Sequence, residues 1–147
     1  MRAPFQILIL PFRKTVEKYE FAIFNRSDAH YWQGIAGGGE DNETPLIAAK
    51  REMLEETGVR IVSDFLELQF KAYVPVSEFE AHKFWPKDLF VIPEYYFAIC
   101  LQNKGINLSH EHTEFKWVDY ETAYDLLHWQ TNKNALWELN ERLKNVR

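Results

Sequence analysis

The stretch Gly37–Val59 reads GGGEDNETPLIAAKREMLEETGV, and it places a run of glycines directly before a helix-forming segment. Thr44 and Pro45 are typical of a helix start, because a threonine hydroxyl caps the first turn and proline is favoured at the first helical position. Gly58 is typical of a helix end, since glycine readily adopts the left-handed conformation found there. We therefore expect a helix from about residue 45 to 57, preceded by a glycine loop whose backbone is free to adopt positive φ angles.

Three glutamates, Glu52, Glu55 and Glu56, share one face of this expected helix, because residues three and four apart are neighbours on a helix surface. Like charges at these spacings repel one another, so the face gains from a positive partner. Hard divalent cations prefer oxygen ligands, and Mg²⁺ can bridge carboxylates to phosphate oxygens. Arg51 lies one turn before Glu55 and could hold that carboxylate in position. A solvated acidic helix face is the alternative interpretation of the glutamates taken alone.

The full spacing resembles the box that defines the Nudix family. That box is a glycine, five residues, a glutamate, seven residues, Arg-Glu, an aliphatic residue, one residue, Glu-Glu, one residue, a glycine and an aliphatic residue. In this sequence the specified positions are Gly37, Glu43, Arg51-Glu52, Met53, Glu55-Glu56, Gly58 and Val59. Every specified position is matched, so the chain is identified as similar to Nudix hydrolases.

The resemblance implies roles for the box residues. Glu52, Glu55 and Glu56 would bind a divalent metal ion, Mg²⁺ or Mn²⁺, and one of them could also act as general base. Arg51 would orient these glutamates, with Glu43 as its own partner.

The glycine segment is assigned by the same resemblance. Gly37 would give a backbone carbonyl to a metal ion, and Gly38 and Gly39 would support the site as part of the glycine loop.

Outside the box, the patterns of apolar and turn residues predict the remaining elements. The expected strands cover residues 5–12, 19–24, 31–36, 59–76, 90–101 and 114–118, and two further helices cover 119–127 and 132–146, with Thr131 as the cap of the last. Such a mixture of strands and helices indicates an α/β or α+β sandwich. The resemblance implies the α/β Nudix fold, an α/β/α sandwich around a mixed β-sheet, formed as one domain over residues 1–147.

A looser resemblance points to one branch of the family, the dATP pyrophosphohydrolases and dihydroneopterin triphosphate pyrophosphatases. It rests on Tyr31-Trp32-Gln33 and on the segment EHTEFKWV at 111–118. Enzymes of this branch often carry a further catalytic glutamate on the loop before the late strand, so Glu111 is the candidate and Glu114 the alternate. The loop 77–90 departs from the branch because it has few arginines, and this leaves the exact substrate open.

Two side chains are candidates for substrate contacts. Trp32 precedes the glycines and could stack on a base or pterin ring, although aromatic residues more often belong to a core. Lys83 could reach phosphates, although a solvated loop lysine is the common alternative.

The expected activity is metal-dependent hydrolysis of a phosphoanhydride bond in a nucleoside or pterin triphosphate, which releases a monophosphate and pyrophosphate. One alternative is a hydrolase of ADP-sugars or dinucleoside polyphosphates. Another is a non-catalytic regulator that binds a nucleotide. The regulator is disfavoured because such proteins usually lose a box glutamate, and none is missing here.

Composition restricts the remaining possibilities. The net charge of −5 at pH 7 argues against a nucleic-acid scaffold, which would show a basic face. No apolar run approaches the roughly 20 residues of a membrane span. Cys100 is the single cysteine, and Met1-Arg2-Ala3-Pro4 lacks the layout of a signal peptide, so we expect a cytoplasmic protein. The expected partner is a small phosphorylated substrate, and a homodimer is left open.

Overall fold

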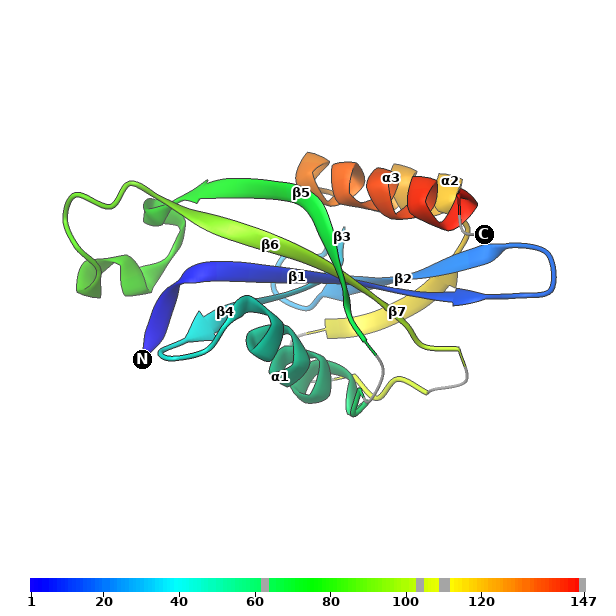
Figure 1. Ribbon diagram of the computed structural model, residues 1–147, viewed down its shortest axis with the longest axis horizontal. Helices are drawn as coiled ribbons and strands as arrows, with labels where there is room; N and C mark the ends of the chain where they lie inside the picture. The colour runs from blue at the N-terminus through cyan, green and yellow to red at the C-terminus, as the bar shows by residue number, and fades with distance from the viewer. Residues whose placement is uncertain (62–63, 103–104, 109–111, 146–147) are drawn as a thin grey trace.

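The structure is a computed structural model that describes residues 1–61, 64–102, 105–108 and 112–145, with the backbone alone at 112–113 (Figure 1). Its strands are β1 (Arg2–Lys14), β2 (Tyr19–Arg26), β3 (Trp32–Gln33), β4 (Ile35–Glu40), β5 (Leu66–Pro75), β6 (Val91–Cys100) and β7 (His112–Val118). Its helices are α1 (Pro45–Thr57), α2 (Tyr120–Leu126) and α3 (Gln130–Lys144), with short 3-10 helices η1 (Val76–Glu78) and η2 (Glu80–Phe84).

The described strands form one mixed sheet around the long strand β1. The sheet runs in the order β3-β2-β1-β6-β5, with β4 also paired to β1 and β7 also paired to β2. Strand β1 is parallel to β6 and antiparallel to β2 and β4. Because β1 is long, its first part pairs with β4, as in Ile7 opposite Gly37, and its last part pairs with β2, as in Phe12 opposite Phe21.

Alternation along β1 divides the core between the two faces of the sheet. Ile7 and Ile9 pack in the cluster that includes the buried residues of α1, whereas Leu8 and Leu10 pack in the cluster that includes α2 and α3. Figure 1 shows the same layers, with α1 on one side of the sheet and α2 and α3 on the other. The predicted α/β/α sandwich around a mixed sheet is therefore confirmed.

Helix α1 has the predicted bounds, and its ends form as the sequence indicates. The Thr44 side chain accepts a hydrogen bond from the Ile47 backbone N–H at 3.2 Å, and Pro45 occupies the first turn. Gly58 adopts a left-handed conformation with φ 72° and donates its N–H to the Leu54 carbonyl at 2.9 Å.

The glycine segment differs from the prediction, because it is a strand rather than a loop. Gly37 and Gly38 belong to β4 and pair with Ile7 and Gln6 of β1. Among the described glycines, a positive φ is found at Gly58 alone. A Cβ atom at Gly37 would instead lie 2.6 Å from Glu52 Oε1, and one at Gly39 would overlap the ring of Phe5. These positions therefore need glycine because other side chains approach the backbone closely.

Two other expectations are corrected. The strand expected over 59–76 begins only at Leu66. Thr131 lies inside α3 and does not cap it; the residue before the helix is Trp129, which makes no side-chain cap. None of the described helices combines the length and the apolar composition needed to cross a membrane.

Candidate active site

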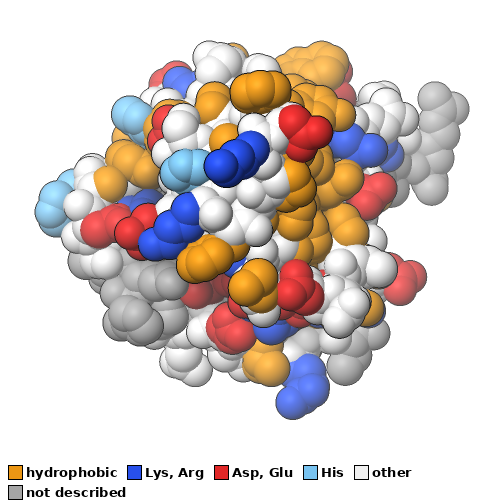
Figure 2. All heavy atoms as spheres, turned by 90° about the vertical axis from the view of Figure 1, so that its left-hand side faces the viewer, with side chains coloured by type: hydrophobic (Ala, Val, Ile, Leu, Met, Phe, Trp, Pro, Cys, Tyr) orange, Lys and Arg blue, Asp and Glu red, His pale blue; other side chains and the backbone are white. Residues whose placement is uncertain are grey.

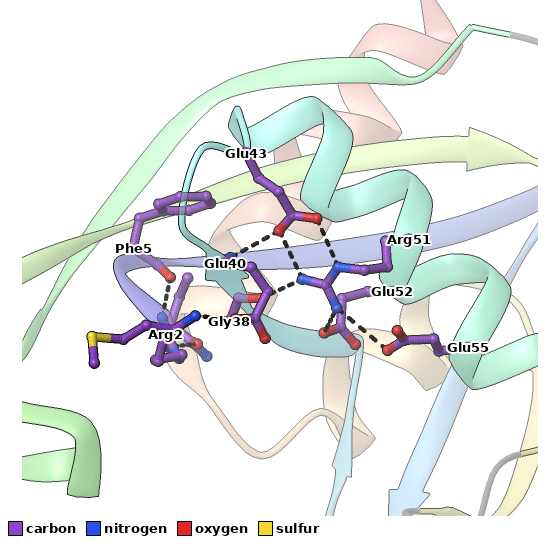
Figure 3. A network of polar contacts seen from close by, with 10 residues as sticks. Arg2, Phe5, Gly38, Glu40, Glu43, Arg51, Glu52 and Glu55 are labelled. Carbon is purple, nitrogen blue, oxygen red and sulfur yellow. Dashed lines mark hydrogen bonds and ion pairs between the residues drawn. The ribbon is translucent and has the colours of Figure 1, made fainter.

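Arg51 of α1 forms hydrogen bonds with β4, with the turn between β4 and α1, and with other side chains of α1 (Figure 3). Its Nε and Nη2 atoms donate to the two carboxylate oxygens of Glu43 at 2.8 and 2.9 Å, and Nη2 also donates to the Gly38 carbonyl at 2.9 Å. Glu43 in turn accepts from the Glu40 backbone N–H at 2.8 Å. The two-point contact between guanidinium and carboxylate therefore fixes α1 against the end of β4.

The ion pair between Arg51 and Glu43 keeps both groups charged. The hydrogen bonds from Arg51 hold the pKa of the Glu43 carboxyl below its ordinary value, and they raise the pKa of the Arg51 guanidinium further. Arg51 is thus a fixed positive charge beside the other box glutamates.

Glu52 is the most enclosed of the charges that Arg51 contacts. Its Oε1 atom accepts from Arg51 Nη1 at 3.0 Å, and its side chain lies in the space that a Cβ at Gly37 would fill. Burial raises the pKa of Glu52 to about 7; the nearby Glu55 and Glu56 act in the same direction, and Arg51 opposes them. A buried carboxyl next to two like charges is stabilised in its ionised form by a cation, so this donor set fits a hard divalent ion.

The other two box glutamates differ in their surroundings. Glu55 is half exposed and lies 3.3 Å from Arg51 Nη1, one helical turn away, whereas Glu56 is buried. Arg51 therefore stands between Glu52 and Glu55 (Figure 3). Within the described part of the chain, no three acidic, histidine or cysteine side chains converge as a ready-made metal cluster.

A pocket of about 500 Å³ lies next to β4 and brings together several strands, η1 and the start of α3. Among its lining residues are Gln6 of β1, Ala36 of β4, Glu94 of β6 and Asn132 of α3. Strand β4 links this pocket to the box, because Ala36 lines the pocket and the adjacent Gly37 contacts Glu52. Successive strand residues face opposite sides of a sheet, so the pocket and Glu52 lie on opposite faces of β4. Among the described strands β4 pairs with β1 alone, so its other edge is free.

Sequence reasoning missed the polar side chains that this pocket buries, which are Gln33, Glu94 and Asn132. Asn132 accepts from the Gly34 backbone N–H at 2.9 Å, and Glu94 accepts from the Tyr96 hydroxyl. Burial raises the pKa of the Glu94 carboxyl. One signal was available, because Glu94 is the only charged residue of the strand VIPEYYFAIC.

The two predicted substrate contacts do not line this pocket. The Trp32 ring packs against the core on the α3 side, with the Lys116 ammonium 4.6 Å from its centroid. Its neighbour Tyr31 lines the pocket instead, together with Trp129 at 5.5 Å between ring centroids. The substrate role of Trp32 therefore stays a prediction that its position does not support.

Lys83 lies on η2, at the end of the molecule shown in Figure 2, where basic, histidine and hydrophobic side chains are mixed on the surface. Its ammonium is 5.4 Å from the centroid of the exposed Phe84 ring. Glu111 lies outside the described residues. Its alternate, Glu114, is exposed on β7 and accepts from the Asn25 amide at 3.2 Å.

Comparison with known proteins settles the family. The sequence profile of the NUDIX domain matches residues 10–138. The chain belongs to the Nudix family and is a Nudix hydrolase. A crystal structure described as a Nudix hydrolase from Listeria monocytogenes is 46% identical, covers 97% of this chain and 96% of its own, and has a TM-score of 0.88.

Two comparisons match this Nudix hydrolase to Escherichia coli proteins that are named for dihydroneopterin triphosphate hydrolysis. The dihydroneopterin triphosphate diphosphatase of strain K12 is 25% identical over 138 residues, which are 92% of this chain and 91% of that protein. The solved structure of the E. coli dihydroneopterin triphosphate pyrophosphohydrolase has a TM-score of 0.77 at 22% identity and covers 96% of this chain and 97% of its own, so it shares the fold.

Replacing Glu43 by glutamine should lower the stability of the Nudix hydrolase by about 1–2 kcal/mol at pH 7, because Arg51 loses a charged partner. The folded pKa of Glu43 is below its unfolded value of about 4.3, so the stabilisation is present above that value and is lost as the pH falls through the folded pKa. Chemical denaturation at several pH values checks this. The stability difference between wild type and variant should shrink in acid, and an undiminished difference at low pH would contradict the ion pair as its source.

Proposed function

We propose that this Nudix hydrolase cleaves a phosphoanhydride bond in a nucleoside or pterin triphosphate, and that it releases a monophosphate and pyrophosphate with Mg²⁺ or Mn²⁺ as its cofactor. The observation that carries the proposal is the position of β4. Its residue Ala36 lines the pocket, and the adjacent Gly37 lies against the carboxylate of Glu52. A ring held in the pocket on the α3 face of β4 could extend a phosphate chain around the free edge of β4 to the box glutamates on the α1 face.

The box residues are expected to have different roles in the reaction. Glu52, Glu55 and Glu56 would hold the divalent ion, with the Gly37 carbonyl as a further ligand. When bound, such an ion neutralises phosphate charge and makes a nearby water more acidic. Arg51 would keep Glu52 and Glu55 in position through the contacts at 3.0 and 3.3 Å. A box glutamate or Glu111 would accept the proton of the attacking water.

The names of the E. coli relatives support a pterin triphosphate among the candidate substrates. At 25% identity this similarity does not distinguish a pterin from a purine ring, so both remain in the proposal. The cytoplasmic location and a homodimer stay predictions from the sequence.

Chelation of divalent ions should abolish hydrolysis, and excess Mg²⁺ or Mn²⁺ should restore it, because the carboxylates alone repel an anionic substrate. The assay should compare nucleoside triphosphates, dihydroneopterin triphosphate, ADP-ribose and diadenosine polyphosphates, with released pyrophosphate and phosphate measured separately. Full activity in chelator would overturn the metal mechanism.

The same panel tests the alternatives. Cleavage confined to ADP-ribose or to diadenosine polyphosphates would overturn the triphosphate assignment. Binding of these compounds without cleavage of any would favour a nucleotide-binding regulator.

A further inference from the structure

The pocket beside β4 buries hydrogen-bonding groups that the protein itself does not use. The Gln33 side-chain nitrogen Nε2 is buried and has no hydrogen-bond partner among the described residues. Unpaired buried polar groups are uncommon and costly in folded proteins, so they call for an explanation. Gln33 also lines the pocket, so a change of its side-chain rotamer would bring this amide to a ligand acceptor there.

Glu94 presents a second unused group to the same pocket. Its Oε1 atom accepts from the Tyr96 hydroxyl, while Oε2 has no partner within the described part of the chain. No described cationic side chain forms an ion pair with Glu94. Its neighbours on the same face of β6, Ile92, Tyr96 and Ala98, are all buried. A carboxylate oxygen accepts more than one hydrogen bond, so both oxygens of Glu94 can still receive ligand donors.

We propose that Glu94 and Gln33 recognise the edge of a substrate ring on which an amino group and a ring N–H stand beside a carbonyl, as in guanine and in pterins. The inference rests on the proposed function and specifies the ring that the pocket accepts. The two adjacent N–H donors of that edge match the two oxygens of Glu94. The neighbouring carbonyl is an acceptor of the kind that the unpaired amide nitrogen of Gln33 requires. Tyr31 and Trp129, which line the same pocket, supply aromatic surface for the faces of the ring.

Other common bases fit this pair of groups less well. Adenine and cytosine place a ring nitrogen acceptor next to the amino group, and that lone pair would face a carboxylate oxygen. Uracil and thymine have one N–H between two carbonyls, so one carbonyl would face Glu94. A site built from buried polar groups rejects ligands that leave those groups unpaired.

Steady-state kinetics on the full chain with Mg²⁺ test this assignment with GTP, dihydroneopterin triphosphate, ATP and CTP as substrates. Wild type should favour GTP or dihydroneopterin triphosphate in kcat/KM over ATP and CTP by roughly 10- to 100-fold. Glu94→Gln should remove most of this preference, chiefly by raising KM for GTP and dihydroneopterin triphosphate. Glu67→Gln is the matched control, because Glu67 is an exposed glutamate of β5 outside the pocket lining, and it should behave as wild type. The comparison between GTP and dihydroneopterin triphosphate identifies which ring is used.

Calorimetric titration with unphosphorylated guanosine, neopterin and adenosine separates this inference from the proposed function, because it requires no hydrolysis. Wild type should bind guanosine or neopterin more tightly than adenosine, and Gln33→Met should weaken that preference. Metal-dependent hydrolysis of all triphosphates without ring preference would overturn the inference and leave the proposed function standing. Ring preference in binding without any hydrolysis would support the inference and overturn the proposed function. A wild type that binds adenosine as tightly as guanosine and neopterin would overturn the inference even if Glu94→Gln failed to fold.

Discussion

Glu56→Gln and Glu55→Gln should each lower kcat by at least roughly 10²–10⁴-fold while the protein still folds. Glutamine keeps the size and the helix propensity of glutamate, but its neutral amide is a much weaker ligand for a hard cation. The loss should therefore concern the chemical step rather than the structure of α1. Steady-state kinetics at saturating Mg²⁺ provide the measurement.

The two variants should differ in stability, which separates chemistry from folding. Glu56 is buried close to Glu52, so Glu56→Gln relieves repulsion between like charges, and the melting temperature without metal should be kept or raised. Glu55 is half exposed and pairs with Arg51 at 3.3 Å, so in Glu55→Gln the lost pair and the relieved repulsion should nearly cancel. A near-wild-type rate for either variant would show that its carboxylate is not a metal ligand.

Gly37→Ala should also lower kcat strongly, as Glu55→Gln and Glu56→Gln do, although it changes no charged group. The added Cβ would lie 2.6 Å from Glu52 Oε1, so the carboxylate or β4 must move. A displacement of about 1 Å at a catalytic group can cost roughly 10²-fold in rate. We expect a loss of that order in kcat, together with a lower melting temperature.

Gly105→Ala is the matched control for this effect, because a Cβ at Gly105 meets no atom within 4 Å. It should retain the wild-type rate. Equal rates for Gly37→Ala and wild type would contradict the close packing of Glu52 on β4.

The helix and its charges could be predicted from the sequence because their signals are local. Thr44, Pro45 and Gly58 act within one turn of the helix end, and the spacing of the glutamates alone places them on one face. The glycine segment was assigned wrongly because glycine serves two purposes. It permits positive φ, and it also permits close approach of another side chain, as Glu52 approaches Gly37. Only the packing of α1 against β4 distinguishes these purposes.

The pocket could not be predicted because it depends on contacts between distant segments. The sequence predicts Trp32 as the ring contact, whereas Tyr31 and Gln33 on either side of it line the pocket. Glu94 lies opposite Gln6 across the parallel pair of β6 and β1, a register that no local pattern specifies.

The central claim is that the carboxylates of α1 support cleavage of a triphosphate into a monophosphate and pyrophosphate. Phosphorus NMR of GTP and of dihydroneopterin triphosphate, each incubated with Mg²⁺ and either wild type or Glu56→Gln, tests it most directly. We predict that monophosphate and pyrophosphate signals grow in equal amounts with wild type and stay absent with Glu56→Gln over the same time. Release of orthophosphate in place of pyrophosphate, or equal turnover by the two proteins, would contradict it.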